Sequence, residues 1–374
     1  MASVEFDDVH VDRGAQTVLR GIDLVVPDGG SVALLGASGS GKSTTLRALA
    51  GLEDLTGGRV LLDGADVSGV PTRDRDLSMV FQGAWMLPHR SVAGNLSFPL
   101  ELRKTPRQER VRRIAAELRA FALNALGGRR PGTLSSGERH IAATAQSMVR
   151  APSVLLMDEP CAQVDAASRH HVLRQIDEVR RGYGSTLLVA TNDRRVAAAL
   201  GDRTAVIEDG QIVQCAPFQV LWAEPATLGA ADLVGEWSLV RLPAQVSTIP
   251  GERVRMRTAL GSLRTWQRDI GQRSTVVIGV RPEEMEVVAA PDGDLRAVVT
   301  RVAPMGGQVV VELAPASPTS RDRAAQRPPA APEEPVVAIA PAPGPRVGEL
   351  VGLQPGAFHI FDGDGRALGV VRRP

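Results

Sequence analysis

A glycine-rich run followed by a lysine and a serine has the clearest chemical purpose in this sequence. Gly36, Gly41, Lys42 and Ser43 fit the spacing G-x-x-x-x-G-K-[ST]. Glycines let backbone N–H groups approach a ligand closely, and those groups form an anion site with the N-terminus of the helix that follows. Lys42 can then reach the β and γ phosphates of a nucleotide, and the Ser43 hydroxyl is suited to Mg²⁺. The predicted phosphate-binding residues are Gly36, Ala37, Ser38, Gly39, Ser40, Gly41, Lys42, Ser43 and Thr44. The alternative is a glycine-rich turn that binds nothing.

Two adjacent carboxylates are the second chemical feature. Asp158 and Glu159 follow the apolar residues 154–157, which places them at the carboxyl end of a buried strand. Neighbouring carboxylates repel each other, so a nearby cation explains them better than a strand that ends in two acids by chance. Asp158 is predicted to hold Mg²⁺, usually through water. Glu159 is predicted to orient and polarise an attacking water molecule.

An α/β sheet is the arrangement that brings these residues together. The short apolar runs 31–36, 153–160 and 185–191 are typical of strands buried on both faces of a mainly parallel sheet. Helical patterns follow them at 42–52, 166–181 and 194–200. The opening runs 4–11 and 19–26 indicate antiparallel strands, and residues 105–126 indicate a helix with Thr105 as N-cap and Pro106 at its first position.

The pattern changes beyond about residue 240. The runs 253–266, 274–288, 295–313 and 349–362 are strand-like and separated by glycine and proline, which predicts a small β-barrel. We therefore expect a first domain over 1–238, with a helical subdomain at about 83–150, and an all-β OB-like or MOP-like domain over 239–374. The Ala- and Pro-rich residues 315–334 are predicted to be a flexible insert, with a Pro-rich docking motif as the alternative.

Composition excludes several classes of function. The 374 residues include 43 basic and 42 acidic side chains, so charge gives no broad reason to bind nucleic acid. Cys161 and Cys215 lie far apart and are interpreted as reduced thiols. No run approaches the roughly 18 apolar residues of a membrane span, and the N-terminus lacks a signal-peptide pattern. We expect that any membrane role is exercised through a partner.

Further motifs extend the pattern to a family. "LSSGERH" at 134–140 is similar to the signature sequence of ABC transporter ATP-binding subunits, which usually reads Leu-Ser-Gly-Gly-Gln. Gln82 in "SMVFQ" matches the Q-loop glutamine, Asp165 in "EPCAQVD" matches the D-loop aspartate, and residues 191–193 correspond to the switch loop. With the phosphate loop and the paired acids, these motifs indicate that nearly the whole chain resembles an ABC-type ATPase.

This resemblance implies a head-to-tail dimer, either of two copies or of this chain with a second ATPase subunit. The phosphate loop of one subunit and the signature of the other would sandwich each ATP, with Ser135, Ser136, Gly137, Glu138 and Asp165 at the nucleotide. Gln82 would sense Mg²⁺ and water, and the implied catalytic residues are Glu159, Asn192, Lys42 and Gln82. Ser43, Gln82 and Asp158 are the implied metal ligands.

Implied partners are two transmembrane permease subunits and an extracytoplasmic substrate-binding protein, with this chain on the cytoplasmic face of the membrane. "VVIGVRPEEMEVV" at 276–288 and "GAFHIFDGDGRAL" at 356–368 are similar to strands of the regulatory domain of importers like the maltose-transporter ATPase. This similarity implies uptake of a sugar such as maltose or trehalose, or of a glycerophospho-compound. Trp85, Met86 and Leu87 are interpreted as part of a groove for a permease helix, with local packing as the alternative.

The sequence departs from the family at three sites. Arg13 stands where an aromatic residue is expected to stack on adenine; its guanidinium either stacks on the base or points to solvent. In the signature, Ser136 replaces a glycine and Glu138 a glutamine, which adds a charge near an anionic nucleotide.

Asn192 replaces the switch histidine, and losing such a contact commonly costs about 10²-fold in rate. These departures predict a slow ATPase. They leave open a regulatory subunit that binds ATP but hydrolyses little. A non-transport ABC protein acting on ribosomes or DNA is disfavoured because the chain has a single cassette and no heptad repeats.

Overall fold

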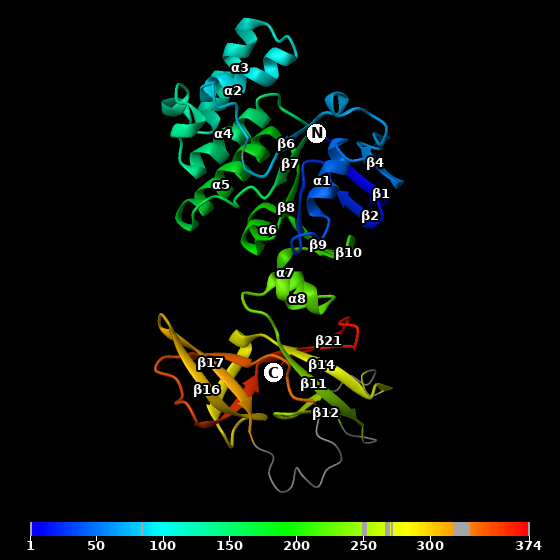
Figure 1. Ribbon diagram of the computed structural model, residues 1–374, viewed down its shortest axis with the longest axis vertical. Coiled ribbons are helices and arrows are strands. Elements are labelled where there is room, and N and C mark those ends of the chain that lie inside the picture. Colours follow the sequence, from blue (N-terminus) through cyan, green and yellow to red (C-terminus); the bar gives the residue numbers. More distant parts are fainter. Residues whose placement is uncertain are drawn as a thin grey trace. The chain divides into compact units, whose positions relative to one another are not determined.

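The computed structural model describes residues 2–83, 85–248, 253–265, 270, 272–316 and 330–372. The chain divides into two compact units, residues 1–219 (unit 1) and 220–374 (unit 2), which are shown in Figure 1. This division falls earlier in the chain than the 238/239 boundary expected from the sequence. Most of the expected insert 315–334 lies outside the described residues, which omit 317–329.

Unit 1 is built on a six-stranded sheet in the order β10-β9-β3-β8-β7-β6. The neighbours from β9 to β6 are parallel, and β10 pairs with β9 in the antiparallel sense. All five residues of β3 and of β7 are buried, which explains their unbroken apolar sequence. The strands are β3 (Ser31–Leu35), β6 (Leu77–Val80), β7 (Val154–Asp158), β8 (Thr186–Thr191), β9 (Arg203–Glu208) and β10 (Gln211–Ala216).

A second, antiparallel sheet has the order β2-β1-β4-β5. The expected antiparallel pairing of the opening strands is confirmed by the register from Val4↔Val26 to Arg13↔Gln16. Helix α1 (Lys42–Ala50) shares a hydrophobic core with both sheets, to which it contributes Leu46 and Leu49. The strands are β1 (Val4–Arg13), β2 (Gln16–Val26), β4 (Gly57–Leu62) and β5 (Ala65–Asp66).

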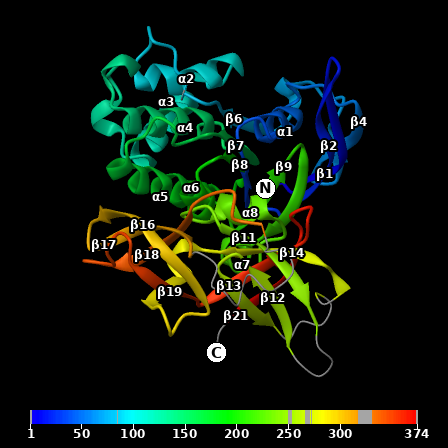
Figure 2. The ribbon, with the colours of Figure 1, turned by 60° about the horizontal axis from the view of Figure 1, so that its bottom comes forward.

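Three helices lie between β6 and β7 in sequence, within the expected helical subdomain: α2 (Val92–Leu102), α3 (Arg107–Ala120) and α4 (Ser136–Met148). Figures 1 and 2 both place α2 and α3 on the opposite side of unit 1 from the antiparallel sheet. The helix expected over 105–126 is shorter, because Ala122 adopts a φ of 51° that ends it. Its N-cap is Pro106 rather than Thr105.

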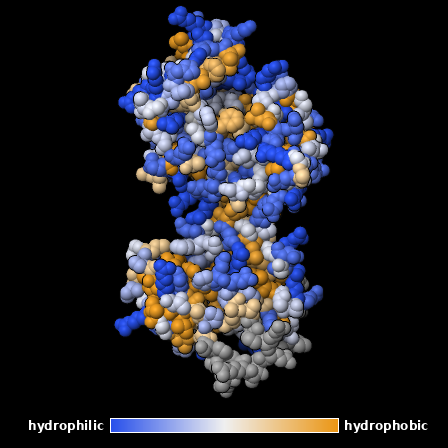
Figure 3. All heavy atoms as spheres, viewed as in Figure 1, coloured by the Kyte–Doolittle hydropathy of each residue, from blue (hydrophilic) through white to orange (hydrophobic). Residues whose placement is uncertain are grey.

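Hydrophilic side chains predominate over unit 1 on the face that Figure 3 shows, with apolar side chains in small groups. Trp85, Leu102 and Val111 are large apolar side chains of the region 85–120 with exposed fractions of 78%, 69% and 61%.

Two further helices of unit 1 are α5 (Ala166–Tyr183) and α6 (Arg194–Leu200). None of the helices in the described ranges has the length and apolar character needed to cross a membrane.

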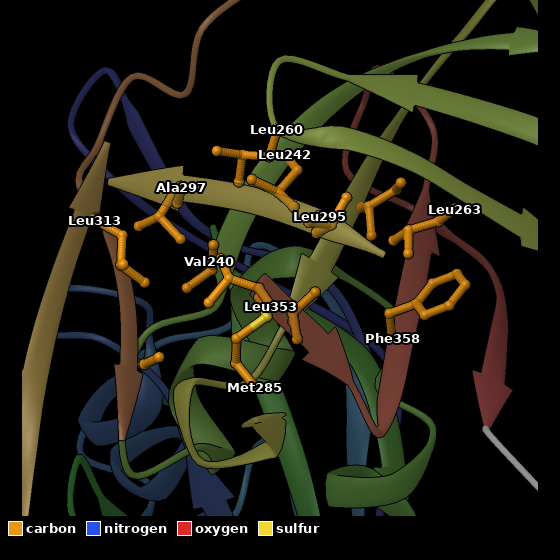
Figure 4. Packing of buried hydrophobic residues seen from close by; sticks show 14 of the residues in the cluster. Val240, Leu242, Leu260, Leu263, Met285, Leu295, Ala297, Leu313, Leu353 and Phe358 are labelled. Atoms are coloured by element: carbon orange, nitrogen blue, oxygen red, sulfur yellow. The ribbon is translucent and has the colours of Figure 1, made fainter. Parts of the chain in front are cut away.

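Unit 2 begins in the first of two short helices, α7 (Phe218–Ala223) and α8 (Leu228–Val234), and continues as an all-β structure. Its described strands form one sheet of 11 strands, all paired in the antiparallel sense. Figure 4 shows side chains from several strands, among them Leu242, Leu295 and Leu353, pointing toward one another in the core. The strand-like runs expected from the sequence are therefore confirmed, and the predicted fold class holds for both units.

The strands of unit 2 are β11 (Val240–Ser247), β12 (Val254–Thr258), β13 (Gly261–Thr265), β14 (Thr275–Val280), β15 (Met285–Ala289), β16 (Leu295–Met305), β17 (Gln308–Pro315), β18 (Val336–Pro341), β19 (Leu350–Pro355), β20 (Ala357–Phe361) and β21 (Ala367–Arg372).

Arg281 explains why residues 220–238 belong with unit 2. Its side chain is fully buried, and its guanidinium donates to the carbonyl oxygens of Trp222 (2.8 Å) and Ala231 (3.5 Å). It also lies 4.7 Å from the centre of the Trp222 ring. Ala231 in turn packs against Phe361 of β20. The two helices thus share a polar and an apolar core with the β-strands.

Candidate functional site

The predicted site residues follow the carboxyl ends of adjacent parallel strands. The phosphate loop 36–41 follows β3, Glu159 follows β7, Asn192 follows β8 and Gln82 follows β6. Since β3, β8, β7 and β6 are consecutive neighbours in the sheet, these segments emerge along one edge. Ligands of open α/β sheets bind at this edge.

The glycines of the phosphate loop meet separate steric demands. A Cβ atom on Gly36 would lie 2.5 Å from both the Ile207 carbonyl oxygen and the Ser40 hydroxyl. Gly41 adopts a φ of 109°, and a Cβ there would lie 2.8 Å from a Leu19 methyl group. Gly39 also has a positive φ, of 84°, but nothing lies within 4 Å of its Cβ position. Residues 37–39 are exposed, so this side of the loop is open to solvent.

Lys42 is buried and held by its own loop. Its Nζ donates to the carbonyl oxygens of Gly36 (2.8 Å) and Ala37 (2.7 Å). Burial lowers the pKa of Lys42, and the charges of Glu159 and Asp158 oppose that shift. The ammonium group is therefore directed at the loop's interior, where an anion could replace the carbonyl oxygens as its partner.

Ser43 and Asp158 meet across the site. The Ser43 hydroxyl donates to a carboxylate oxygen of Asp158 at 2.9 Å. An alcohol and a carboxylate oxygen are hard donors that suit Mg²⁺, which usually takes few protein ligands together with substrate phosphates and water. No group of three or more His, Cys, Asp or Glu side chains is placed to bind a metal within the described ranges.

Glu159 is held in place by the last residues of β8 and by Asn192, which follows the strand. Its carboxylate accepts hydrogen bonds from the Asn192 backbone N–H (2.9 Å) and the Thr191 hydroxyl (3.3 Å), and its own N–H donates to Ala190 (2.8 Å). Its backbone φ of 49° is uncommon for a residue with a side chain. Burial raises the pKa of Glu159, and the nearby Lys42 opposes the shift. The carboxylate is thus oriented before a substrate arrives.

The signature segment begins helix α4, as expected. Ser135 is its N-cap: its hydroxyl accepts from the Glu138 backbone N–H, and the Glu138 carboxylate accepts from the Ser135 N–H at 2.8 Å. The Glu138 charge is therefore turned back onto its own helix. Asp165 is the N-cap of helix α5, and its carboxylate accepts from the Ser168 N–H at 2.9 Å.

Comparison with known proteins decides the family. A model of the ABC transporter family matches residues 19–162, and a TOBE domain model matches residues 278–361. The Fe(3+) ions import ATP-binding protein FbpC of Rhizobium etli is 35% identical over 310 residues, covering 83% of this chain and 87% of that protein. This chain belongs to the ABC transporter ATP-binding family. The Sulfoquinovosyl glycerol transport ATP-binding protein SmoE of Agrobacterium fabrum is 31% identical over 368 residues, covering 97% and 98% of the two chains.

A solved structure supports the same assignment. The dimeric structure of a post-hydrolysis state of an ATP-binding cassette bound to ADP and Pi matches with a TM-score of 0.51 and 25% identity. It covers 57% of this chain and 98% of that chain. The predicted ABC-type ATPase, an ATP-binding enzyme, is therefore confirmed.

Two ABC motif residues have unexpected contacts. Arg13, expected either to stack on adenine or to point to solvent, forms a two-bond ion pair with Glu53, at 2.8 Å and 2.6 Å. The guanidinium is thus paired with a carboxylate, although the Arg13 side chain itself remains 45% exposed. The carbonyl oxygen of Gln82 accepts a hydrogen bond from the Trp85 indole N–H at 3.1 Å. Trp85 is nevertheless 78% exposed, which local packing does not explain.

The contacts of three residues that support the ABC site were not predicted from the sequence. Thr191 is the second donor to Glu159, and its place beside Asn192 was the available signal. Arg75 is buried and donates to the carbonyl oxygens of Ala48 and Leu49, which end helix α1. Arg169 joins the D-loop to the switch loop. Nothing in the charged sequences around Arg75 and Arg169 sets these two arginines apart from surface residues.

Proposed function

We propose that two copies of this chain close around two ATP molecules and energise import of a sugar or glycerophospho-compound through two permease subunits. The observation that carries the proposal is the carboxylate of Glu159, fixed by Thr191 and Asn192 at the sheet edge that carries the phosphate loop. A water molecule polarised there would attack the terminal phosphate. Lys42 would bind the β and γ phosphates.

Ser43 and Asp158 are the residues that would hold Mg²⁺, with Gln82 as a third candidate. When bound, the ion neutralises charge on the phosphates. The 2.9 Å contact between the Ser43 and Asp158 oxygens supports this role. The test is nucleotide binding with and without Mg²⁺ in wild type and Ser43→Ala; equal Mg²⁺ dependence in the two proteins would contradict it.

A second subunit is proposed because the signature residues make their hydrogen bonds within the first turn of α4. Ser135, Ser136, Gly137 and Glu138 would meet the nucleotide of the other subunit, with Asp165 nearby. The homodimer is favoured over a pair with a different ATPase, since both halves of the composite site are present in this chain. Light scattering of a Glu159→Gln protein with ATP and Mg²⁺ should show a dimer that the nucleotide-free protein does not form.

The solute is proposed from the relatives and from unit 2. SmoE, named for transport of sulfoquinovosyl glycerol, matches along 97% of this chain, whereas FbpC, named for import of Fe(3+), matches along 83%. A substrate-binding protein outside the membrane would deliver the solute. In vesicles holding the assembled transporter, sugar-loaded binding protein should stimulate ATP hydrolysis; stimulation by Fe(3+) instead would overturn the assignment.

The exposed Trp85 and its neighbours 86–87 are the proposed contact with the permease. The peripheral, cytoplasmic-face location of the chain follows from that contact. Trp85→Ala should weaken co-purification with the permeases and leave hydrolysis by the isolated chain unchanged. Unweakened co-purification would contradict the contact.

Slow hydrolysis is proposed because Asn192 lacks the imidazole of the usual switch histidine. Its backbone N–H holds Glu159, and its side chain is exposed. An Asn192→His variant should hydrolyse ATP about tenfold faster in the assembled transporter. Equal rates would show that the substitution does not limit the reaction. The alternative, an ATP-binding regulatory subunit with little activity, predicts that wild type and Glu159→Gln have the same low rate.

A further inference from the structure

Arg169 connects two loops of the site that are distant in sequence. It lies in the first turn of α5, after the D-loop, and its guanidinium donates to the Asp193 carboxylate at 2.8 Å and to the Val164 carbonyl oxygen at 3.3 Å. The side chains of Arg169 and Asp193 are 26% and 28% exposed. One planar group thus holds the D-loop backbone and the loop after β8 at the same time.

Asp193 is connected to Glu159 through hydrogen bonds of the Thr191 hydroxyl. Its backbone N–H donates to the Thr191 hydroxyl at 3.0 Å, and that hydroxyl donates to Glu159 at 3.3 Å. Its carboxylate also accepts from the Arg195 N–H at 2.8 Å, which caps α6. Asn192, between Thr191 and Asp193, donates its backbone N–H to the other Glu159 oxygen.

We propose that Arg169 and Asp193 are positioning residues that hold the Thr191–Asp193 loop so that its backbone and hydroxyl orient the Glu159 carboxylate. Positioning of Glu159 by the main chain of this loop then replaces part of the function of the switch histidine, which this chain lacks. The proposal rests on the proposed role of Glu159 in hydrolysis. The same contacts couple the D-loop to Glu159, because a movement of the Val164 backbone would displace the Arg169 guanidinium.

The mutation that tests this bridge is Arg169→Met, which keeps the aliphatic stem and removes both hydrogen bonds. A partly exposed ion pair contributes little to folding, so the variant should keep its melting temperature. Misplacing Glu159 should lower kcat about tenfold or more, with the KM for ATP changed less than about twofold. Arg169→Lys should have a higher kcat than Arg169→Met, because lysine places a positive charge near Asp193 but lacks the forked donors of the guanidinium.

The matched control is Arg174→Met on the same helix. Arg174 is 60% exposed and its partner is Glu178, at 3.7 Å, so the variant removes an arginine of α5 without touching the loop after β8. Its kcat should equal that of wild type.

A double-mutant cycle completes the test. Asp193→Asn keeps the cap of α6 and removes the charge, so it should lower kcat as Arg169→Met does. The double variant should be no worse than the poorer single variant, since both act through one bond. Additive losses, or an Arg169→Met kcat within about twofold of wild type while Glu159→Gln is inactive, would overturn the inference alone. An active Glu159→Gln would instead overturn the proposed role of Glu159.

Discussion

Lys42 in unit 1 and Arg281 in unit 2 are both buried cations, with exposed fractions of 6% and 0%. Burial lowers the pKa of each, and each donates hydrogen bonds to backbone carbonyl oxygens. Their surroundings differ. Lys42 bonds to a loop with an open side, whereas Arg281 lies over the Trp222 ring and ties two helices to a β-structure.

These surroundings distinguish a buried cation that can bind a ligand from one that stabilises the fold. A Cβ on Gly39, in the exposed part of the phosphate loop, would meet nothing within 4 Å, whereas Cβ atoms on Gly36 and Gly41 would clash. A Cβ on Gly235 would lie 2.6 Å from an Arg281 nitrogen. The loop that holds the lysine is therefore open on one side only, and the arginine is enclosed. We infer that the partners of Lys42 can be exchanged for a ligand, whereas those of Arg281 are permanent.

The largest expected effect is a loss of ATP hydrolysis without a loss of stability in the variant Lys42→Met. Lys42→Met should reduce ATP hydrolysis about 10²- to 10³-fold, because a donor to the phosphates is lost. It should not lower the free energy of unfolding of unit 1, because the variant removes a desolvated charge whose partners are loop carbonyls. Single-turnover hydrolysis and urea unfolding measure the two effects. A clear loss of stability would place Lys42 in the same class as Arg281.

The opposite result is expected for Arg281→Met. The Trp222 carbonyl oxygen loses its donor, the Ala231 carbonyl oxygen keeps only the Gly235 N–H, and the Trp222 ring loses its cation. These losses should cost unit 2 about 2–4 kcal/mol of stability. Hydrogen exchange of the β14 and β20 amides in the full chain reports this loss. ATP affinity of unit 1 serves as the control and should be unchanged. Unaltered exchange would mean that Arg281 is dispensable to the fold.

A buried histidine near Arg281 should make the stability of unit 2 depend on pH. His359 is 3% exposed, and burial, with the charges of Arg281 and Arg372, lowers its pKa to about 4. Because the unfolded chain binds a proton near pH 6.5 and the folded chain does not, unit 2 should lose stability as the pH falls from about 6.5 to about 4, by up to about 3 kcal/mol. His359→Phe should show a smaller loss over this range. Hydrogen exchange at several pH values tests it; identical slopes for both proteins would contradict it.

The smallest effect is expected at Glu138, whose carboxylate caps its own helix. Glu138→Gln keeps the capping box and should change hydrolysis less than about threefold, whereas Glu138→Ala should cost α4 about 0.5–1 kcal/mol. ATPase rates and thermal unfolding of the two variants measure these effects. A rate increase above about tenfold in Glu138→Gln would show that repulsion of the nucleotide, rather than capping, dominates at this residue.

Much of the site could be predicted because it is local in sequence. Residues 36–43 carry the loop, the cation and the hydroxyl within one strand–helix connection, and Asp158 and Glu159 are adjacent. The fold class followed from strand runs that are buried on both faces. Strand β18 was not predicted, because it follows an Ala- and Pro-rich stretch and its pairing with β17 is not visible from composition.

The phosphate loop, the paired carboxylates and the alternation of strands and helices can be recognised from the residues alone, because spacing and hydrophobic period act within short segments. The partners of Arg13, Arg75, Arg169 and Arg281 depend on how distant segments fold together. An arginine side chain is long, and its forked donors bond to whichever carbonyl or carboxylate the fold brings within reach. Residues such as Arg169 and Asp193 are distant in sequence and are brought together by the sheet and its helices. Their contacts therefore exist only after the chain has folded.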